Sequence, residues 1–146
     1  MNIINIFKFL TIQTLILYYL IINNSNSPTF IKNSIINMIL TTSICGSLLF
    51  YMNSEKYIVK TKLSKTILII IDILGHIIPL IYCLYTINNN YKGPMEFNSI
   101  IIQYIYIALY LIMTDIKRLY FDISYYQLVL MPLLIHTSII YLLDKI

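Results

Sequence analysis

Asp72, His76 and His136 are ionisable residues that lie inside long apolar segments of this sequence. Asp72 and His76 are four residues apart, and on a helix that spacing places both on one face, together with Pro79 and Cys83. Ionisable residues inside a membrane-spanning segment are costly and usually face the interior of the helix bundle. We therefore expect the other helices to be arranged around the segment that contains Asp72 and His76.

Three kinds of chemistry could use these side chains. A carboxylate and two imidazoles that step through a membrane could carry protons or ions. Imidazoles on facing helices, here His76 and His136, could hold a haem or a metal, although no dedicated metal-ligand motif is present. A hydrolase would use Asp72 and His76 with a hydroxyl nucleophile from Thr41 or Thr42. The alternative is that these groups only hydrogen-bond neighbouring helices, each bond contributing about 0.5–2 kcal/mol.

The elements that position these residues must lie in a membrane. Of 146 residues, 59% are hydrophobic and only 11% are charged, with a mean hydropathy of +0.79. Soluble domains carry about a quarter charged residues, so too few charges are present to cover a water-facing surface of this size. The composition predicts an integral membrane protein whose first partner is the lipid bilayer. No basic helix or basic, aromatic-lined groove is present, which argues against nucleic acid as a partner.

The apolar segments predict an all-α, polytopic transmembrane helix bundle that forms a single domain. Turn-forming residues separate the segments, and the connection at residues 53–65 is expected to be a basic loop. If the first segment is a cleaved signal peptide or lies in the interface, four spans remain. Five spans are expected, at residues 3–22, 30–52, 66–87, 98–114 and 125–143.

The second span has a centre of small, polar residues. Thr42 with Gly46, and Ser43 with Ser47, are pairs of small residues four positions apart. Such pairs let another helix approach the backbone closely. Packing is therefore the first interpretation of this patch, and a hydroxyl of Thr41 or Thr42 offered to a buried site is the second.

The basic residues predict the orientation of the bundle. Five spans place the N-terminus and the connections 53–65 and 115–124 on one side of the membrane. That side holds seven of the ten positive residues and the other side three. The positive-inside rule then places the N-terminus inside and the C-terminus outside. The seven are Lys8, Lys56, Lys60, Lys62, Lys65, Lys117 and Arg118, against Lys32, Lys92 and Lys145.

This orientation predicts the depth of several side chains. His76 and His136 are each about 15 Å into their spans, near the bilayer midplane. Tyr106, in the fourth span, could reach the same level. Cys45 lies deep in its span and Cys83 lies near the end of another, so we expect two free thiols rather than a disulfide.

Residues 75–80, GHIIPL, carry a histidine followed closely by a proline, and a tyrosine-rich span and loop follow. This arrangement, over residues 72–143, resembles the androgen-induced-gene family of membrane lipid hydrolases, with one span fewer. The resemblance implies hydrolysis of a lipid ester by a threonine and a histidine from separate spans. His76 would match the histidine, and Thr41 or Thr42 would match the threonine.

Two functions are open. The first is a small, non-enzymatic membrane component that packs against other membrane protein subunits. It could belong to a viral or organellar membrane, because the abundance of Ile, Asn, Tyr and Lys suggests an A/T-rich genome. The second is an intramembrane enzyme or a cofactor- or ion-binding protein that uses Asp72, His76 and His136. We expect geometry to separate them: histidines that point at each other within the bundle favour the second function, and histidines that point outward to different surfaces favour the first.

Overall fold

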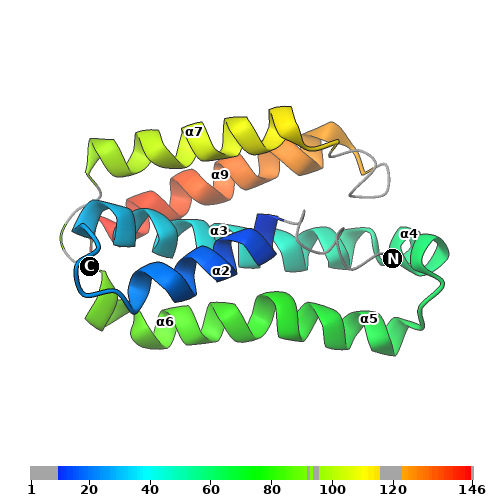
Figure 1. Cartoon of the computed structure of the whole chain (residues 1–146). Coiled ribbons are helices and arrows are strands. Elements are labelled where there is room, and N and C mark those ends of the chain that lie inside the picture. The colour runs from blue at the N-terminus through cyan, green and yellow to red at the C-terminus, as the bar shows by residue number, and fades with distance from the viewer. Residues whose placement is uncertain (1–9, 92, 94–95, 116–122, 146) are drawn as a thin grey trace.

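The computed structural model describes residues 10–91, 93, 96–115 and 123–145, and the regular elements in those ranges are all helical. The helices lie lengthwise beside one another in a bundle (Figure 1). This confirms the all-α prediction. The elements are α2 (Leu10–Ile22), α3 (Thr29–Met52), α4 (Ser54–Thr61), α5 (Lys65–Asp72), the π-helical turn η1 (Ile73–Ile77), α6 (Ile78–Asn90), α7 (Phe97–Met113) and α9 (Tyr125–Leu143).

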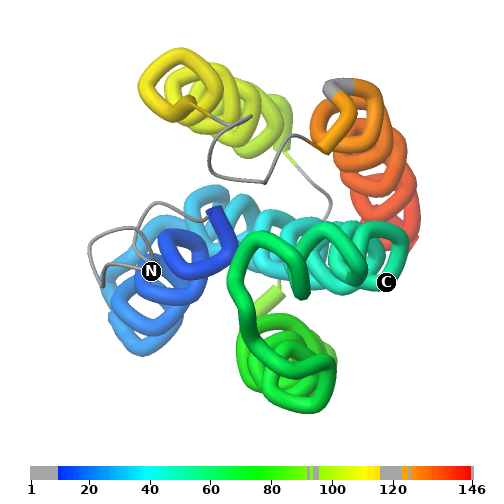
Figure 2. Tube along the Cα trace, turned by 90° about the vertical axis from the view of Figure 1, so that its right-hand side faces the viewer, coloured from blue at the N-terminus to red at the C-terminus, as the bar shows by residue number. Residues whose placement is uncertain are grey.

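Helix α3 lies at the centre of the bundle. It packs against α2, α6 with η1, α7 and α9, and Figure 2 shows it surrounded by these helices when the bundle is viewed end on. Within its most apolar stretch 61% of α3 is buried, against 17% for Lys65–Asn90. The expectation that the segment with Asp72 and His76 is central is therefore wrong. The reason is side-chain size, because small buried residues such as Ser34 and Ser43 let several helices approach α3.

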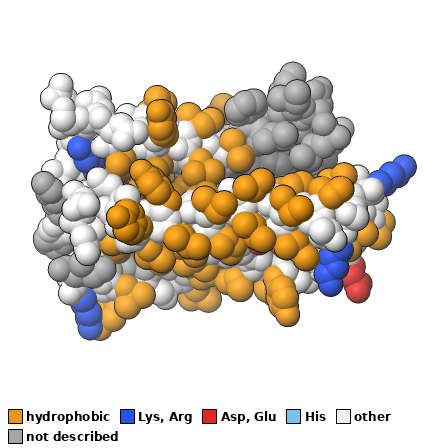
Figure 3. Space-filling model, turned by 90° about the horizontal axis from the view of Figure 1, so that it is seen from below, with side chains coloured by type: hydrophobic (Ala, Val, Ile, Leu, Met, Phe, Trp, Pro, Cys, Tyr) orange, Lys and Arg blue, Asp and Glu red, His pale blue; other side chains and the backbone are white. Residues whose placement is uncertain are grey.

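Three helices are long and apolar enough to cross a membrane: Thr29–Met52, Lys65–Asn90 and Tyr126–Leu143. Helices α2 and α7 are also apolar but are shorter, at 13 and 17 residues. Figure 3 shows apolar side chains along the length of one face, with charged side chains towards its two ends. Such a surface is expected where lipid, rather than water, surrounds the protein. Exposed apolar residues of α5, η1 and α6 include Ile70, Ile71, Leu74, Ile78, Ile81 and Leu84.

Helices α5 and α6 are joined through η1 into one continuous helix. In this turn the N–H of Ile78 bonds to the carbonyl of Ile73, five residues back rather than four. Pro79 follows and has no N–H to donate, so the regular ladder is interrupted at this point. Single π-helical turns inside α-helices often mark functional positions, and His76 lies in this one.

Hydroxyl groups tie α2 to the helices around it. The Thr14 and Thr42 hydroxyls are 3.1 Å apart, and the Tyr18 hydroxyl is 2.7 Å from that of Thr86. Tyr106 on α7 donates to Oε1 of Gln13 at 2.7 Å. These bonds join α2 to α3, α6 and α7, and they commit the Tyr106 hydroxyl to a structural role.

Several boundaries differ from the sequence prediction. The segment at residues 53–65 is not simply a loop, because it contains α4, which ends where Lys62 adopts a left-handed conformation with φ of 59°. The first span is described only from Leu10, so residues 3–9 lie outside the described residues, as do 116–122 of the following charged connection. Cys45 and Cys83 are both buried and free, as predicted.

Candidate functional site: a cavity inside the bundle

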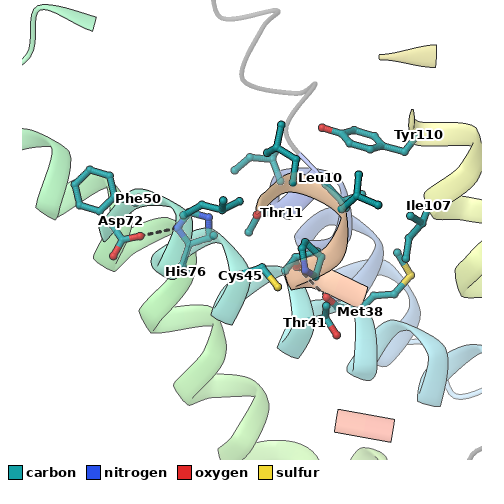
Figure 4. Close-up of a pocket in the computed structure, with 18 of the residues that line it drawn as sticks. Leu10, Thr11, Met38, Thr41, Cys45, Phe50, Asp72, His76, Ile107 and Tyr110 are labelled. Atoms are coloured by element: carbon teal, nitrogen blue, oxygen red, sulfur yellow. Dashed lines mark hydrogen bonds and ion pairs between the residues drawn. The ribbon is translucent and has the colours of Figure 1, made fainter. Parts of the chain in front are cut away.

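The structure contains a cavity of about 550 Å³ against the second half of α3. Side chains of α2, α4, α5 with η1, α7 and α9 form the rest of its wall, and most of them are apolar. Ligand pockets in proteins typically have volumes of about 300–1,000 Å³. The residues predicted as catalytic or cofactor-binding all lie in this one wall, partly shown in Figure 4: Thr41, Thr42, Asp72, His76 and His136.

Asp72 and His76 form a hydrogen-bonded pair in the wall. His76 Nδ1 is 2.9 Å from Asp72 Oδ1, and the Ser47 hydroxyl donates to Oδ1 and Oδ2 of Asp72 at 3.1 and 3.0 Å. A carboxylate can only accept, so Nδ1 of His76 carries a hydrogen. In the neutral ring the lone pair is then on Nε2, on the side of the imidazole away from Asp72 (Figure 4). The pair is the arrangement by which a carboxylate orients an imidazole for general-base work.

Gly46 makes the position of His76 possible. A Cβ atom at Gly46 would lie 2.1 Å from Nε2 of His76, so the imidazole rests directly against the α3 backbone. This agrees with the prediction that small residues around position 46 admit a close neighbour. Gly75 also lines the cavity, but a Cβ there would meet no atom within 4 Å. The two glycines therefore differ, since only Gly46 is required by a contact.

His136 belongs to a buried cluster between α3, α7 and α9. Its Nε2 atom hydrogen-bonds to Oε1 of Gln103 and is 3.0 Å from Nδ2 of Asn37. Asn37 Nδ2 also donates to Oε1 of Gln103, at 2.6 Å. All three side chains are at most 1% exposed. Sequence reasoning did not place Asn37 and Gln103 at a site. The available signal was an amide side chain inside each of the apolar segments 30–52 and 98–114.

The hydrogen bonds of Gln103 determine the tautomer of His136. Gln103 Nε2 donates to the carbonyl of Ser99 at 2.9 Å, which identifies Oε1 as the atom that faces His136. Because Oε1 only accepts, His136 Nε2 must carry the hydrogen. In the neutral ring Nδ1 is then an acceptor. Among the described residues nothing donates to Nδ1 of His136 or to Oδ1 of Asn37, although both atoms are buried.

The two candidate threonines differ in what their hydroxyls contact. Thr42 donates to the carbonyl of Met38 at 2.9 Å and contacts the hydroxyl of Thr14. The Thr41 hydroxyl is buried in the cavity wall and has no hydrogen-bond partner among the described residues. Of the two, only Thr41 therefore has a hydroxyl without a hydrogen-bond partner in the described part of the chain.

Both histidines line the cavity, with His76 bonded to Asp72 and His136 to Gln103. That the two rings point at each other stays a prediction. Within the described ranges, no three His, Cys, Asp or Glu residues come together in a way that could hold a metal ion. A haem or metal bound by His76 and His136 stays a prediction. No protein family model matches the chain, and no curated protein and no solved structure matches it either.

Proposed function

We propose that the protein binds a lipid-like molecule with a long apolar part, in a cavity inside its membrane-embedded helix bundle. The observation that carries this proposal is the wall of the cavity, where Asp72, His76 and His136 interrupt an otherwise mostly apolar lining. Binding sites for small molecules are typically built this way, with an apolar surface for affinity and a few polar groups for orientation. A bundle that acts only by packing has no need of such a space. The role as a membrane protein subunit, which the sequence placed first, therefore becomes the less favoured prediction.

We further propose that five helices cross the membrane, with the N-terminus inside. Supporting this, α2 and α7 run alongside the three long helices (Figure 1), although α2 is only about 20 Å long over its described residues. The excess of basic residues on the N-terminal side of such a bundle supports the orientation. The cavity would then open from the half of the bundle that contains α4, on the inner side.

Narrowing the cavity should weaken ligand binding. Gly75→Leu adds an apolar side chain at the cavity wall, where a Cβ meets no atom within 4 Å. We expect saturable labelling of cavity peptides by a diazirine-bearing long-chain probe to fall about tenfold or more, which is the loss of roughly 1.4 kcal/mol of binding free energy. The measurement is photolabelling of the purified protein in detergent, with peptide mapping.

Leu74→Phe is the matched control, because it changes the neighbouring residue, which is 60% exposed and does not line the cavity. Its labelling should equal that of the unmodified protein. Equal labelling in Gly75→Leu, or labelling that does not saturate, would contradict binding in this cavity.

A second candidate function is hydrolysis of a lipid ester, and the Asp72–His76 pair is the observation that favours it. His76 Nε2 would take a proton from water as the water oxygen attacks the ester carbonyl carbon. The tetrahedral intermediate would then expel the alcohol, which takes that proton from the imidazole, leaving an acid and an alcohol. The Thr41 hydroxyl is the alternative nucleophile.

Hydrolysis should depend on both members of this pair. General-base catalysis contributes about 10²–10⁴-fold, so His76→Ala should reduce turnover of a fluorogenic long-chain ester by at least about 100-fold. Asp72→Asn should lower turnover as well, because a neutral amide stabilises the protonated imidazole less than a carboxylate does. Asp144→Asn, at the end of α9 and outside the cavity wall, is the control. Unchanged turnover in His76→Ala would exclude this mechanism while leaving binding intact.

A further inference from the structure

We propose that helix α4 and the turn after it bind the phosphate groups of anionic lipids at the membrane surface. The inference goes beyond the cavity and its ligand, and neither proposal depends on the other. It rests on where α4 lies, on which of its faces is exposed, and on the charge of that face. The side chains that would contact the lipid head groups are those of Lys56, Lys60, Lys62 and Lys65.

Short connections hold α4 at one end of the bundle (Figure 1). Asn53 alone separates α4 from α3, and only residues 62–64 separate it from α5. Asn53 is buried, so this corner is part of the packed bundle. The helices on either side, Thr29–Met52 and Lys65–Asn90, are both long enough to cross a membrane. Because α4 joins two such helices, it would lie where the membrane meets water.

The contacts of α4 with the bundle determine which of its faces points outward. Tyr57 and Thr61 are four residues apart and line the cavity. The ring of Tyr57 also packs edge-on against Phe50 of α3, with 5.7 Å between the ring centroids. Lys56 and Lys60 are likewise four residues apart, and both are exposed. One face of α4 therefore closes the cavity while its lysines face away from the bundle.

The exposed side of this segment is strongly basic. Residues 53–65 carry four lysines, all exposed, against a single carboxylate, that of Glu55. The connection 115–124 does not offset this charge, because it holds two basic and two acidic residues. Groups of about four to eight basic residues next to a membrane-spanning helix attract anionic head groups. The charge of this segment therefore matches a phosphate-bearing lipid.

Apolar side chains beside the lysines favour a lipid over a soluble acidic partner. Tyr51, Met52 and Val59 are 82%, 54% and 74% exposed. A segment that exposes lysines and apolar side chains together suits a lipid, which presents a phosphate group and, below it, acyl chains. In the proposed orientation this segment meets the inner leaflet, whose anionic lipids give that surface its negative potential.

Quenching of a single introduced tryptophan tests the proposal in the full chain, which has no tryptophan of its own. Val59→Trp places the fluorophore between Lys56 and Lys60 on the outward side of α4. Tyr19→Trp is the matched control, because Tyr19 is 71% exposed and lies on α2 towards the opposite end of the bundle. Each protein is reconstituted in phosphatidylcholine vesicles that contain either brominated phosphatidylserine or brominated phosphatidylcholine. The ratio of the two quenching efficiencies measures the local preference for the anionic lipid.

In Val59→Trp we expect phosphatidylserine to be preferred about fivefold, the value that one lysine contact with a head group would give. The preference should fall towards one in about 1 M salt, where the screening length is only about 3 Å. Tyr19→Trp should show no preference. Equal quenching by the two lipids in Val59→Trp, or an equal preference at both positions, would overturn the proposal. Quenching by neither lipid in Val59→Trp would overturn it as well, because α4 would then lie away from the bilayer.

Removing the charges assigns the preference to these lysines. In the Val59→Trp protein the preference should fall to about one when all four are neutralised, because the attraction is electrostatic. Neutralising Lys32 and Lys145, outside this segment, is the control and should leave it at about fivefold. A preference that survives the loss of all four lysines would refute the assignment, and one that survives about 1 M salt would refute it even if the fourfold variant fails to fold. The four changes are Lys56→Gln, Lys60→Gln, Lys65→Gln and Lys62→Asn, since asparagine tolerates the left-handed conformation at position 62.

Discussion

Replacing Gln103 by leucine should lower the free energy of unfolding by about 3 kcal/mol. Oε1 of Gln103 accepts from Asn37 on α3 and from His136 on α9, so the substitution leaves two donors on two other helices without an acceptor. Each buried polar group left without a partner costs about 1–3 kcal/mol, and part of that cost is recovered because the unfolded chain in lipid also finds partners. The effect should be among the largest of any single polar substitution in the bundle.

Unfolding in mixed micelles with increasing sodium dodecyl sulfate measures this change. Gln127→Leu is the matched control, since the Gln127 side chain is partly exposed and its recorded contact with Asn53 is 3.5 Å long. That variant should lower the free energy of unfolding by less than about 0.5 kcal/mol, as is usual for surface substitutions. Similar costs for the two variants would show that the buried cluster does not hold α3, α7 and α9 together.

A methyl group at Gly46 should displace His76 and destabilise the bundle by about 2 kcal/mol, within the range for overpacked sites. The added Cβ would lie 2.1 Å from Nε2 of His76, which is far inside van der Waals contact. The imidazole or the η1 turn must therefore move away from α3, and the bond between His76 and Asp72 is then strained or lost. Gly75→Ala meets no atom and should instead be neutral or stabilising, because alanine favours a helix over glycine by about 0.5–1 kcal/mol.

The chain has two histidines, so nuclear magnetic resonance of labelled imidazoles can follow each ring. In Gly46→Ala the signals of His76 should shift while those of His136 stay in place. In a His76→Ala background, Gly46→Ala should no longer destabilise the protein, because the three nearest atoms to the added Cβ all belong to the imidazole. If Gly46→Ala still lowered the free energy of unfolding without the imidazole, the cause would be the α3 backbone rather than this contact.

Most helix positions could be predicted from the sequence because they depend on local properties. The apolar segments 30–52, 98–114 and 125–143 became Thr29–Met52, Phe97–Met113 and Tyr125–Leu143. Composition and length determine such segments almost alone. The helix α4 was missed because its eight residues are mostly polar and the basic residues were interpreted as a loop. The pairing of Asp72 with His76 was predictable too, since residues four apart on a helix are neighbours.

The arrangement of the helices was not predictable in the same way. The segment with Asp72 and His76 has the most conspicuous polar residues, but α3 is the centre, because its small buried residues allow close approach from several sides. Polar residues mark where a helix needs a partner, whereas side-chain volume decides how many partners can reach it.

The sequence by itself determined that this is an apolar, all-helical protein, where its main helices run, and that Asp72 and His76 share a helix face. Only the tertiary structure decided that His136 meets Asn37 and Gln103, which are 99 and 33 positions away in the chain, and that Ser47 meets Asp72. Helical periodicity relates residues within one helix and contains no information on which helices adjoin. The acceptor of His136 and the hydroxyl of Thr41, both left without a partner, became visible only when the surrounding helices were in place.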